Sequence, residues 1–100
     1  MVKVNWSKQA IEDLYHIREY LSLTSPRFAD AIVDGIFEKE HLLATHPFIG
    51  RMVPEFRRKY IRELLYKQYR IVYHIVSDSQ IDVMAVHHSS SNLSETSLFE

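Results

Sequence analysis

The run IRELLYKQYRIVYHIV, residues 61–76, decides the fold of this 100-residue chain. Isoleucine, valine, tyrosine and leucine, which favour strands, fill it on both sides of a LysGln pair. A third run of this kind covers residues 80–87, after SerAspSer. Such short connections predict an antiparallel meander with strands at residues 60–66, 69–76 and 80–87. LysGln lacks the Asn or Gly of a tight hairpin, so we expect the first loop to be longer than two residues.

Side chains of the middle strand should alternate between two faces. One face would carry Tyr69, Ile71, Tyr73 and Ile75, and the other Arg70, Val72, His74 and Val76. We expect the first face to meet the rest of the domain. Arg70 would then be displayed on the second face, beside Arg62 of the preceding strand.

Two helices are predicted upstream of the meander, after a short strand at residues 2–6. Ser7 is a suitable N-cap for a helix over residues 8–22, where apolar residues recur at helical spacing. Ser25 followed by Pro26 starts a second helix over residues 26–45, and close packing against the first helix would explain its internal Gly35. The short connection predicts an antiparallel helical hairpin. The fold class is therefore α+β, with an N-terminal strand and this hairpin packed on a small, mainly antiparallel sheet that the meander completes.

Length and composition indicate a single globular domain. Hydrophobic residues make up 46% and charged residues 25% of the chain, close to the globular average. No apolar run approaches the roughly 20 residues of a membrane span, and the absence of cysteine fits a cytoplasmic protein. We expect the domain to cover residues 1–88. Residues 89–100, rich in serine, are expected to form a flexible tail, in which Leu93, Leu98 and Phe99 leave open a docking segment.

Positive charge is concentrated in the middle of the chain. Residues 51–70 hold seven basic and two acidic side chains, a net charge of +5, although the whole chain carries −1. The basic residues are Arg51, Arg57, Arg58, Lys59, Arg62, Lys67 and Arg70. They predict a surface for an anionic partner, such as nucleic acid or an acidic peptide, with an ordinary solvated basic face as the alternative.

The residues offer one candidate for catalysis and none for a cofactor. The six histidines lack metal-ligand spacing, and His87 and His88 should point to opposite faces of a strand, so we expect no metal site. Arg62 and Arg70 could grip a phosphodiester if they converge, with His87 or His88 as general acid or base. That would be a metal-free ribonuclease site. The alternative is that both arginines pair with nearby carboxylates.

The order of elements and several short motifs resemble the RelE/ParE toxin superfamily of bacterial type II toxin–antitoxin systems, over roughly residues 3–90. The motifs are His46-Pro47, Gly50-Arg51, Pro54-Glu55, Arg62-Glu63-Leu64, the strand YRIVY and a histidine after the last strand. RelE-like members of this superfamily cut messenger RNA on the ribosome, whereas ParE-like members poison DNA gyrase. No tyrosine follows Tyr73 and there is no clear lysine pair, so the chain looks closer to the ParE and plasmid-stabilisation branch.

The resemblance implies a cytoplasmic toxin that arrests growth through DNA gyrase and forms a hetero-oligomer with an antitoxin. The flexible segment of that antitoxin would bind on the helical pair and the basic patch. One alternative is a RelE-like endoribonuclease acting on the ribosome and messenger RNA, with Arg62, Arg70, His87 and His88 as catalytic residues. Another is an inactive member that binds only the antitoxin. No cofactor is implied by any of the three.

Overall fold

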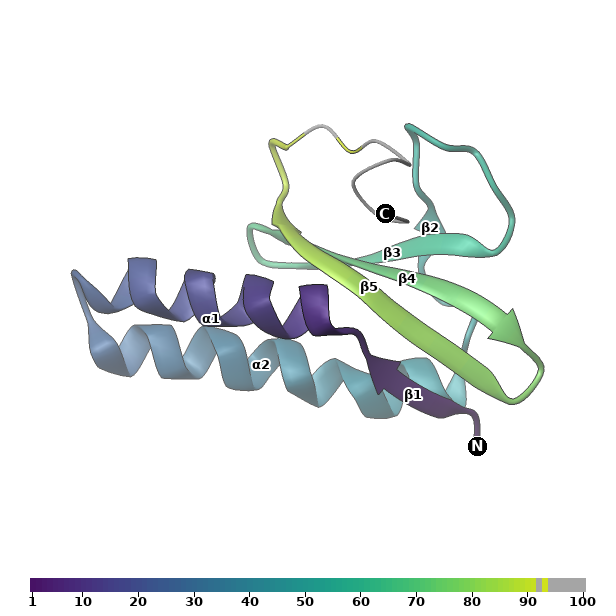
Figure 1. Cartoon of the computed structure of the whole chain (residues 1–100), viewed down its shortest axis with the longest axis horizontal. Helices are drawn as coiled ribbons and strands as arrows, with labels where there is room; N and C mark the ends of the chain where they lie inside the picture. Colours follow the sequence, from purple (N-terminus) through teal and green to yellow (C-terminus); the bar gives the residue numbers. More distant parts are fainter. Residues whose placement is uncertain (92, 94–100) are drawn as a thin grey trace.

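The computed structural model describes residues 1–91 and 93, and shows two helices packed on one face of a five-stranded sheet (Figure 1). The elements are β1 Lys3–Trp6, α1 Lys8–Ser22, α2 Pro26–Thr45, β2 Arg51–Met52, β3 Ile61–Tyr66, β4 Tyr69–Ser77 and β5 Gln80–His88. The strand order across the sheet is β1-β5-β4-β3-β2. The predicted α+β class is confirmed. Within the described part of the chain, no helix is both long and apolar enough to cross a membrane.

Both helices start at the predicted caps. The Ser7 hydroxyl accepts a hydrogen bond from the Ala10 amide, and the Ser25 hydroxyl accepts one from the Phe28 amide, each at 3.1 Å. Pro26 occupies the first turn of α2, where its missing amide hydrogen leaves no intrahelical bond unmade. The helices lie side by side, and the end where α1 turns into α2 projects beyond the sheet (Figure 1).

The sheet contains the predicted meander and two pairings that the sequence pattern did not indicate. β3, β4 and β5 pair antiparallel, as predicted. β1 pairs parallel with β5, from Lys3 opposite Gln80 to Trp6 opposite Val83. β2 has only two residues, which is too few for a periodic pattern, and pairs antiparallel with β3. β1 and β2 therefore form the two edges of the sheet.

The two faces of β4 pack into different apolar clusters. Tyr69, Ile71, Tyr73 and Ile75 lie in the main core with the buried faces of α1 and α2, which confirms their predicted direction. The opposite face, called the outer face below, carries a smaller cluster of Val53, Ile61, Val72, Ala85 and Leu93. A β-bulge adds Met84 to β5 between the partners of Val72 and Tyr73.

The turn between β3 and β4 is tighter than predicted. Tyr66 pairs with Tyr69, so only Lys67 and Gln68 form the connection. Lys67 adopts a left-handed backbone conformation with φ of 51°. The expectation of a longer loop was wrong because a residue other than glycine or asparagine takes this conformation here. The packing of both strands into the core offsets a strain of roughly 1 kcal/mol.

Replacing Lys67 with glycine should raise the free energy of unfolding by up to about 1 kcal/mol, since glycine adopts positive φ without steric cost. Urea denaturation monitored by circular dichroism would measure the change. Gln68→Gly is the matched control, because Gln68 has no positive φ and should lose roughly 0.5–1 kcal/mol. Equal losses in both variants would contradict the assignment of strain to Lys67.

Gly35 was predicted to pack against α1, but its nearest neighbour is Tyr66 of the sheet. A Cβ atom at this position would collide with the ring and hydroxyl of Tyr66 on β3. The glycine therefore creates space for an aromatic side chain between α2 and β3.

Candidate functional site

Arg70 of β4 is buried on the outer face and binds two carboxylates. Its Nε donates to Glu63 Oε1 at 2.6 Å, while Nη1 and Nη2 donate to Glu55 Oε2 and Oε1 at 2.8 and 2.7 Å. Nη1 also donates to the Ser91 carbonyl oxygen at 2.8 Å. The side chain of Arg70 is 6% exposed. Its guanidinium is thus occupied by protein partners and is not displayed for a phosphodiester.

Glu63 connects Arg70 to a second arginine. Its side chain is fully buried on β3, where Oε1 accepts from Arg70 and Oε2 accepts from Arg51 Nε at 2.6 Å. We refer to Arg51, Glu63, Arg70 and Glu55 as the ion chain. Throughout residues 1–91 and 93, every buried side-chain nitrogen or oxygen has a hydrogen-bond partner. Buried charges are tolerated when they are paired in this way.

The ion chain shifts the protonation of its members. The Arg70 guanidinium lowers the pKa of Glu55 to about 2, against an ordinary value of 4.5, and the Leu93 amide adds to this effect while burial opposes it. The same contact with Glu55 raises the pKa of Arg70 above its ordinary value. At neutral pH both groups are therefore charged.

The low pKa of Glu55 predicts a loss of stability in acid. A depressed carboxyl pKa stabilises the fold above pH 4.5, and this contribution disappears as the pH falls from 4.5 towards 2. We expect Glu55→Gln to be less stable than the natural chain at pH 7. The difference in free energy of unfolding should shrink across that acid range. Chemical denaturation at several pH values would measure it, and a constant difference would contradict the shift.

Arg62 lies on the opposite face of the sheet from Arg70, so the prediction that the two share a face was wrong. The register places Arg62 opposite Tyr73 and Leu65 opposite Arg70. Arg62 Nε donates to the Lys59 carbonyl at 2.9 Å and Nη1 to the Gly50 carbonyl at 2.8 Å, with the guanidinium 4.9 Å from the Phe48 ring centre. Arg62 therefore fixes the chain before β3 and does not join Arg70 in one patch.

The two late histidines point to opposite faces, as predicted. His87 is the cross-strand neighbour of Arg70 on the outer face. His88 packs edge-on against Tyr69 at 5.9 Å on the helix side, and its Nδ1 lies 2.8 Å from the Ser90 hydroxyl. The predicted catalytic set is thus divided between two faces, and only His87 and Arg70 are neighbours. In the part of the chain described here, no three His, Cys, Asp or Glu side chains gather into a metal site.

The remaining basic residues are exposed, and three of them form one loop. We call residues 53–60, between β2 and β3, the basic loop; it displays Arg57, Arg58 and Lys59. Arg51 and Lys67 are also exposed. The predicted anionic-partner set therefore separates into exposed cations, of which Arg51 also pairs with Glu63, and two arginines, Arg62 and Arg70, whose guanidiniums bind groups of the protein itself.

The HPFIGR motif before the basic loop requires a glycine at position 50 because the chain there lies close to Tyr73 and β3. The Gly50 amide donates to the Tyr73 hydroxyl at 3.0 Å, and that hydroxyl donates to the Pro47 carbonyl at 2.7 Å. A Cβ at Gly50 would lie 2.5 Å from the Glu63 carbonyl oxygen. Only glycine allows this approach, which brings the neighbouring Arg51 to Glu63.

The start of the segment predicted to be a flexible tail is held by the fold. The Ser89 amide donates to the Gln68 carbonyl at 2.7 Å, and the Leu93 amide donates to Glu55 Oε2 at 3.1 Å. Leu93 is 7% exposed and belongs to the outer-face cluster. We call residues 89–91 and 93 the C-terminal strap. Leu98 and Phe99, also considered as docking residues, lie outside the described part of the chain.

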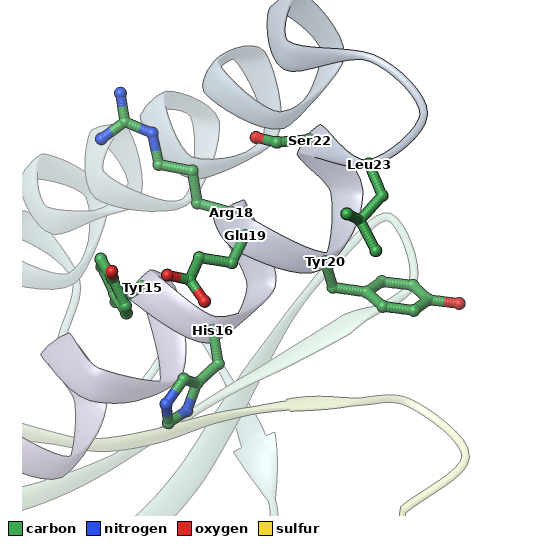
Figure 2. Close-up of a pocket in the computed structure, with 7 residues that line it drawn as sticks. All are labelled: Tyr15, His16, Arg18, Glu19, Tyr20, Ser22 and Leu23. Atoms are coloured by element: carbon green, nitrogen blue, oxygen red, sulfur yellow. The ribbon is translucent and has the colours of Figure 1, made fainter.

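A shallow hollow of about 700 Å³ lies along the second half of α1 (Figure 2). It is lined by Tyr15, His16, Arg18, Glu19, Tyr20, Ser22 and Leu23. Tyr20 and Leu23 project away from the helix and are 72% and 84% exposed. The family resemblance implied that the antitoxin binds on the helical pair, but the sequence did not single out this hollow. The available signal was that Tyr20 and Leu23 are large apolar residues outside the buried stripe of the helix.

Comparisons with known proteins agree with this architecture. The family model described as the ParE toxin of the type II toxin–antitoxin system parDE matches residues 4–93. A solved structure of the chromosomal ParDE system from P. aeruginosa is 22% identical with a TM-score of 0.71, covering 88% of this chain and 96% of that one. The toxin–antitoxin complex RelBE2 from Mycobacterium tuberculosis is 22% identical with a TM-score of 0.60, covering 87% and 96%. No curated protein matches the chain.

Proposed function

We propose that this chain, which belongs to the ParE toxin family of type II toxin–antitoxin systems, arrests growth by binding DNA gyrase rather than by cutting RNA. The proposal rests on the positions of the two central arginines, which lie on opposite faces of the sheet and bind groups of the protein itself. Arg70 is buried with two carboxylates, and Arg62 holds backbone carbonyls on the other face. A ribonuclease site needs convergent groups free to reach a phosphate, whereas binding to a large partner needs an exposed surface.

The exposed cations of the basic loop supply such a surface. Arg57 and Lys59 stand on a loop whose one carboxylate, Glu55, faces inward to Arg70. A positive loop of this kind favours an anionic partner and increases the rate of association. We assign Arg51, Arg57, Arg58, Lys59 and Lys67 to the contact with gyrase or with the DNA that it holds.

The antitoxin partner fits a different surface. The hollow on α1 combines exposed apolar side chains, Tyr20 and Leu23, with charged neighbours, Arg18 and Glu19. Amphipathic helices bind in apolar grooves with charged rims. We propose that the antitoxin covers this hollow in a toxin–antitoxin hetero-oligomer, and that the toxin acts in the cytoplasm, where gyrase and ribosomes operate.

Two assays on the purified chain test the mechanism. We expect inhibition of gyrase supercoiling and no cleavage of ribosome-programmed messenger RNA. Cleavage without gyrase inhibition would overturn the proposal in favour of the RelE-like activity, with His87 beside Arg70 as the place to look. The absence of growth arrest in cells at verified expression would indicate an inactive family member.

The basic loop has its own test. Changing Arg57, Arg58 and Lys59 together to glutamine should raise the concentration for half-inhibition of gyrase by about tenfold or more, because the loop loses three positive charges. The matched control changes Lys3, Lys8 and Arg27 to glutamine, which alters net charge equally at exposed positions elsewhere. Equal effects of the two variants would show that net charge, and not the loop, governs inhibition.

A further inference from the structure

The basic loop contains a turn and a residue with positive φ, and its own backbone hydrogen bonds account for only part of this conformation. The amides of Phe56 and Arg57 both donate to the Val53 carbonyl, at 3.0 and 2.9 Å. Arg57 adopts a left-handed conformation with φ of 54°. A non-glycine residue remains in this region only when its surroundings hold it there. Those surroundings therefore determine where the loop displays its cations.

The C-terminal strap is one of the groups that hold the loop. Leu93 inserts into the outer-face cluster that contains Val53 and, at its margin, Phe56. Its amide donates to Glu55 Oε2, the same oxygen that accepts from Arg70 Nη1. Arg70 Nη1 in turn donates to the Ser91 carbonyl. Glu55 is thus bound from one side by β4 and from the other by the strap.

The far end of the loop is fixed separately. Arg62 Nε donates to the Lys59 carbonyl, and Ile61 N donates to the Arg58 carbonyl at 3.3 Å. The cations consequently lie between two anchors, Glu55 at the start of the loop and Lys59 at its end. Arg70 binds Glu55 in any case, so loss of the strap would remove only the Leu93 side of the first anchor and its packing on Val53 and Phe56. The loop would then be freer to move, and its cations would no longer be held in one arrangement for an anionic partner.

We propose that the C-terminal strap, through Leu93 and its contact with Glu55, positions the basic loop for its target. Leu93 is a positioning residue, because it acts through Glu55 and the loop and need not touch the partner. The functional consequence rests on the proposed role of the basic loop. The claim that the strap holds the loop in place does not rest on that role, so the structural and functional claims are tested separately.

The structural arm measures amide hydrogen exchange in the full chain. Leu93→Ala should accelerate exchange at Phe56 and Arg57 by about tenfold or more. Val33→Ala is the matched control, since Val33 is a buried residue of α2 and does not belong to the outer-face cluster that Leu93 joins. Exchange rates that are equal in the two variants, after correction for global stability, would overturn the proposal. Leu93→Met should keep the exchange rates of the natural chain, because methionine fills a similar apolar volume.

The functional arm compares gyrase inhibition by the same variants at several salt concentrations. Leu93→Ala should lose inhibition as the loop variant does and should depend less on salt, which loss of stability alone would not cause. If the loop variant is impaired but Leu93→Ala inhibits normally, positioning by the strap is wrong and the loop keeps its role. If the loop variant is unimpaired, the proposed function of the loop fails, and hydrogen exchange alone decides the structural claim.

Discussion

Replacing Arg70 with methionine should lower the free energy of unfolding by about 3–5 kcal/mol, because it leaves a buried carboxylate without its main partner. Glu63 is 1% exposed and would keep only Arg51, while Glu55 would lose its bidentate contact. Urea denaturation of the purified chain at pH 7 would measure the loss. A change below about 1 kcal/mol would show that the ion chain does not hold the outer face together.

Two further variants make this result specific. Arg27→Met removes an arginine from the exposed first turn of α2 and should change stability by less than about 0.5 kcal/mol. Adding Glu63→Leu to Arg70→Met should recover part of the loss, since an apolar residue replaces the stranded charge. Because Arg70 variants are expected to lose stability, failure of such a variant to cut RNA would not identify Arg70 as catalytic. The folding of the variant must be verified first.

Changing Tyr20 and Leu23 together to aspartate should weaken antitoxin binding by about 100-fold or more. These two side chains are the most exposed apolar residues of the α1 hollow, and tyrosine is among the residues that carry most of the binding energy at protein interfaces. An aspartate buried there without a partner would add a desolvation cost. Calorimetry with a purified antitoxin would measure affinity. In cells, the variant should remain toxic when the antitoxin is co-expressed.

The control for this prediction is Val76→Asp, which places a charge on a half-exposed apolar position of β4 away from α1. It should bind the antitoxin normally. All these side chains are substantially exposed, so unfolding measurements should show little change in stability. Normal neutralisation of the Tyr20 and Leu23 variant would move the antitoxin site to another surface.

The helices could be predicted from the sequence because their N-terminal caps and apolar spacing are strong local signals. Ser7, Ser25 and Pro26 mark the starts of the helices, and both helices have the predicted bounds. The parallel pairing of β1 with β5 was not readable, because it joins Lys3 to Gln80 across nearly the whole chain. β2 was missed because two residues carry no periodicity.

The error at the candidate site follows from a single turn. Accepting LysGln as a two-residue connection pairs Tyr66 with Tyr69, and counting outward then puts Arg62 opposite Tyr73 and Glu63 opposite Val72. Because side chains alternate, that register separates Arg62 from Arg70 and places Glu63 on the face of Arg70. A glutamate and an arginine on one face of two apolar strands were the available sign of a buried ion pair. The strap remained unpredictable, since it depends on tertiary contacts of Leu93.

The parallel contact between β1 and β5 also constrains when the protein can fold during synthesis. β1 is made first, yet its partner in the sheet starts at Gln80, so it has no strand to join until most of the chain has left the ribosome. The helical hairpin can form earlier, but its apolar face stays uncovered until the meander arrives. A truncated translation product would therefore lack the complete five-stranded sheet, and we expect the proposed growth arrest to require translation to reach the end of β5.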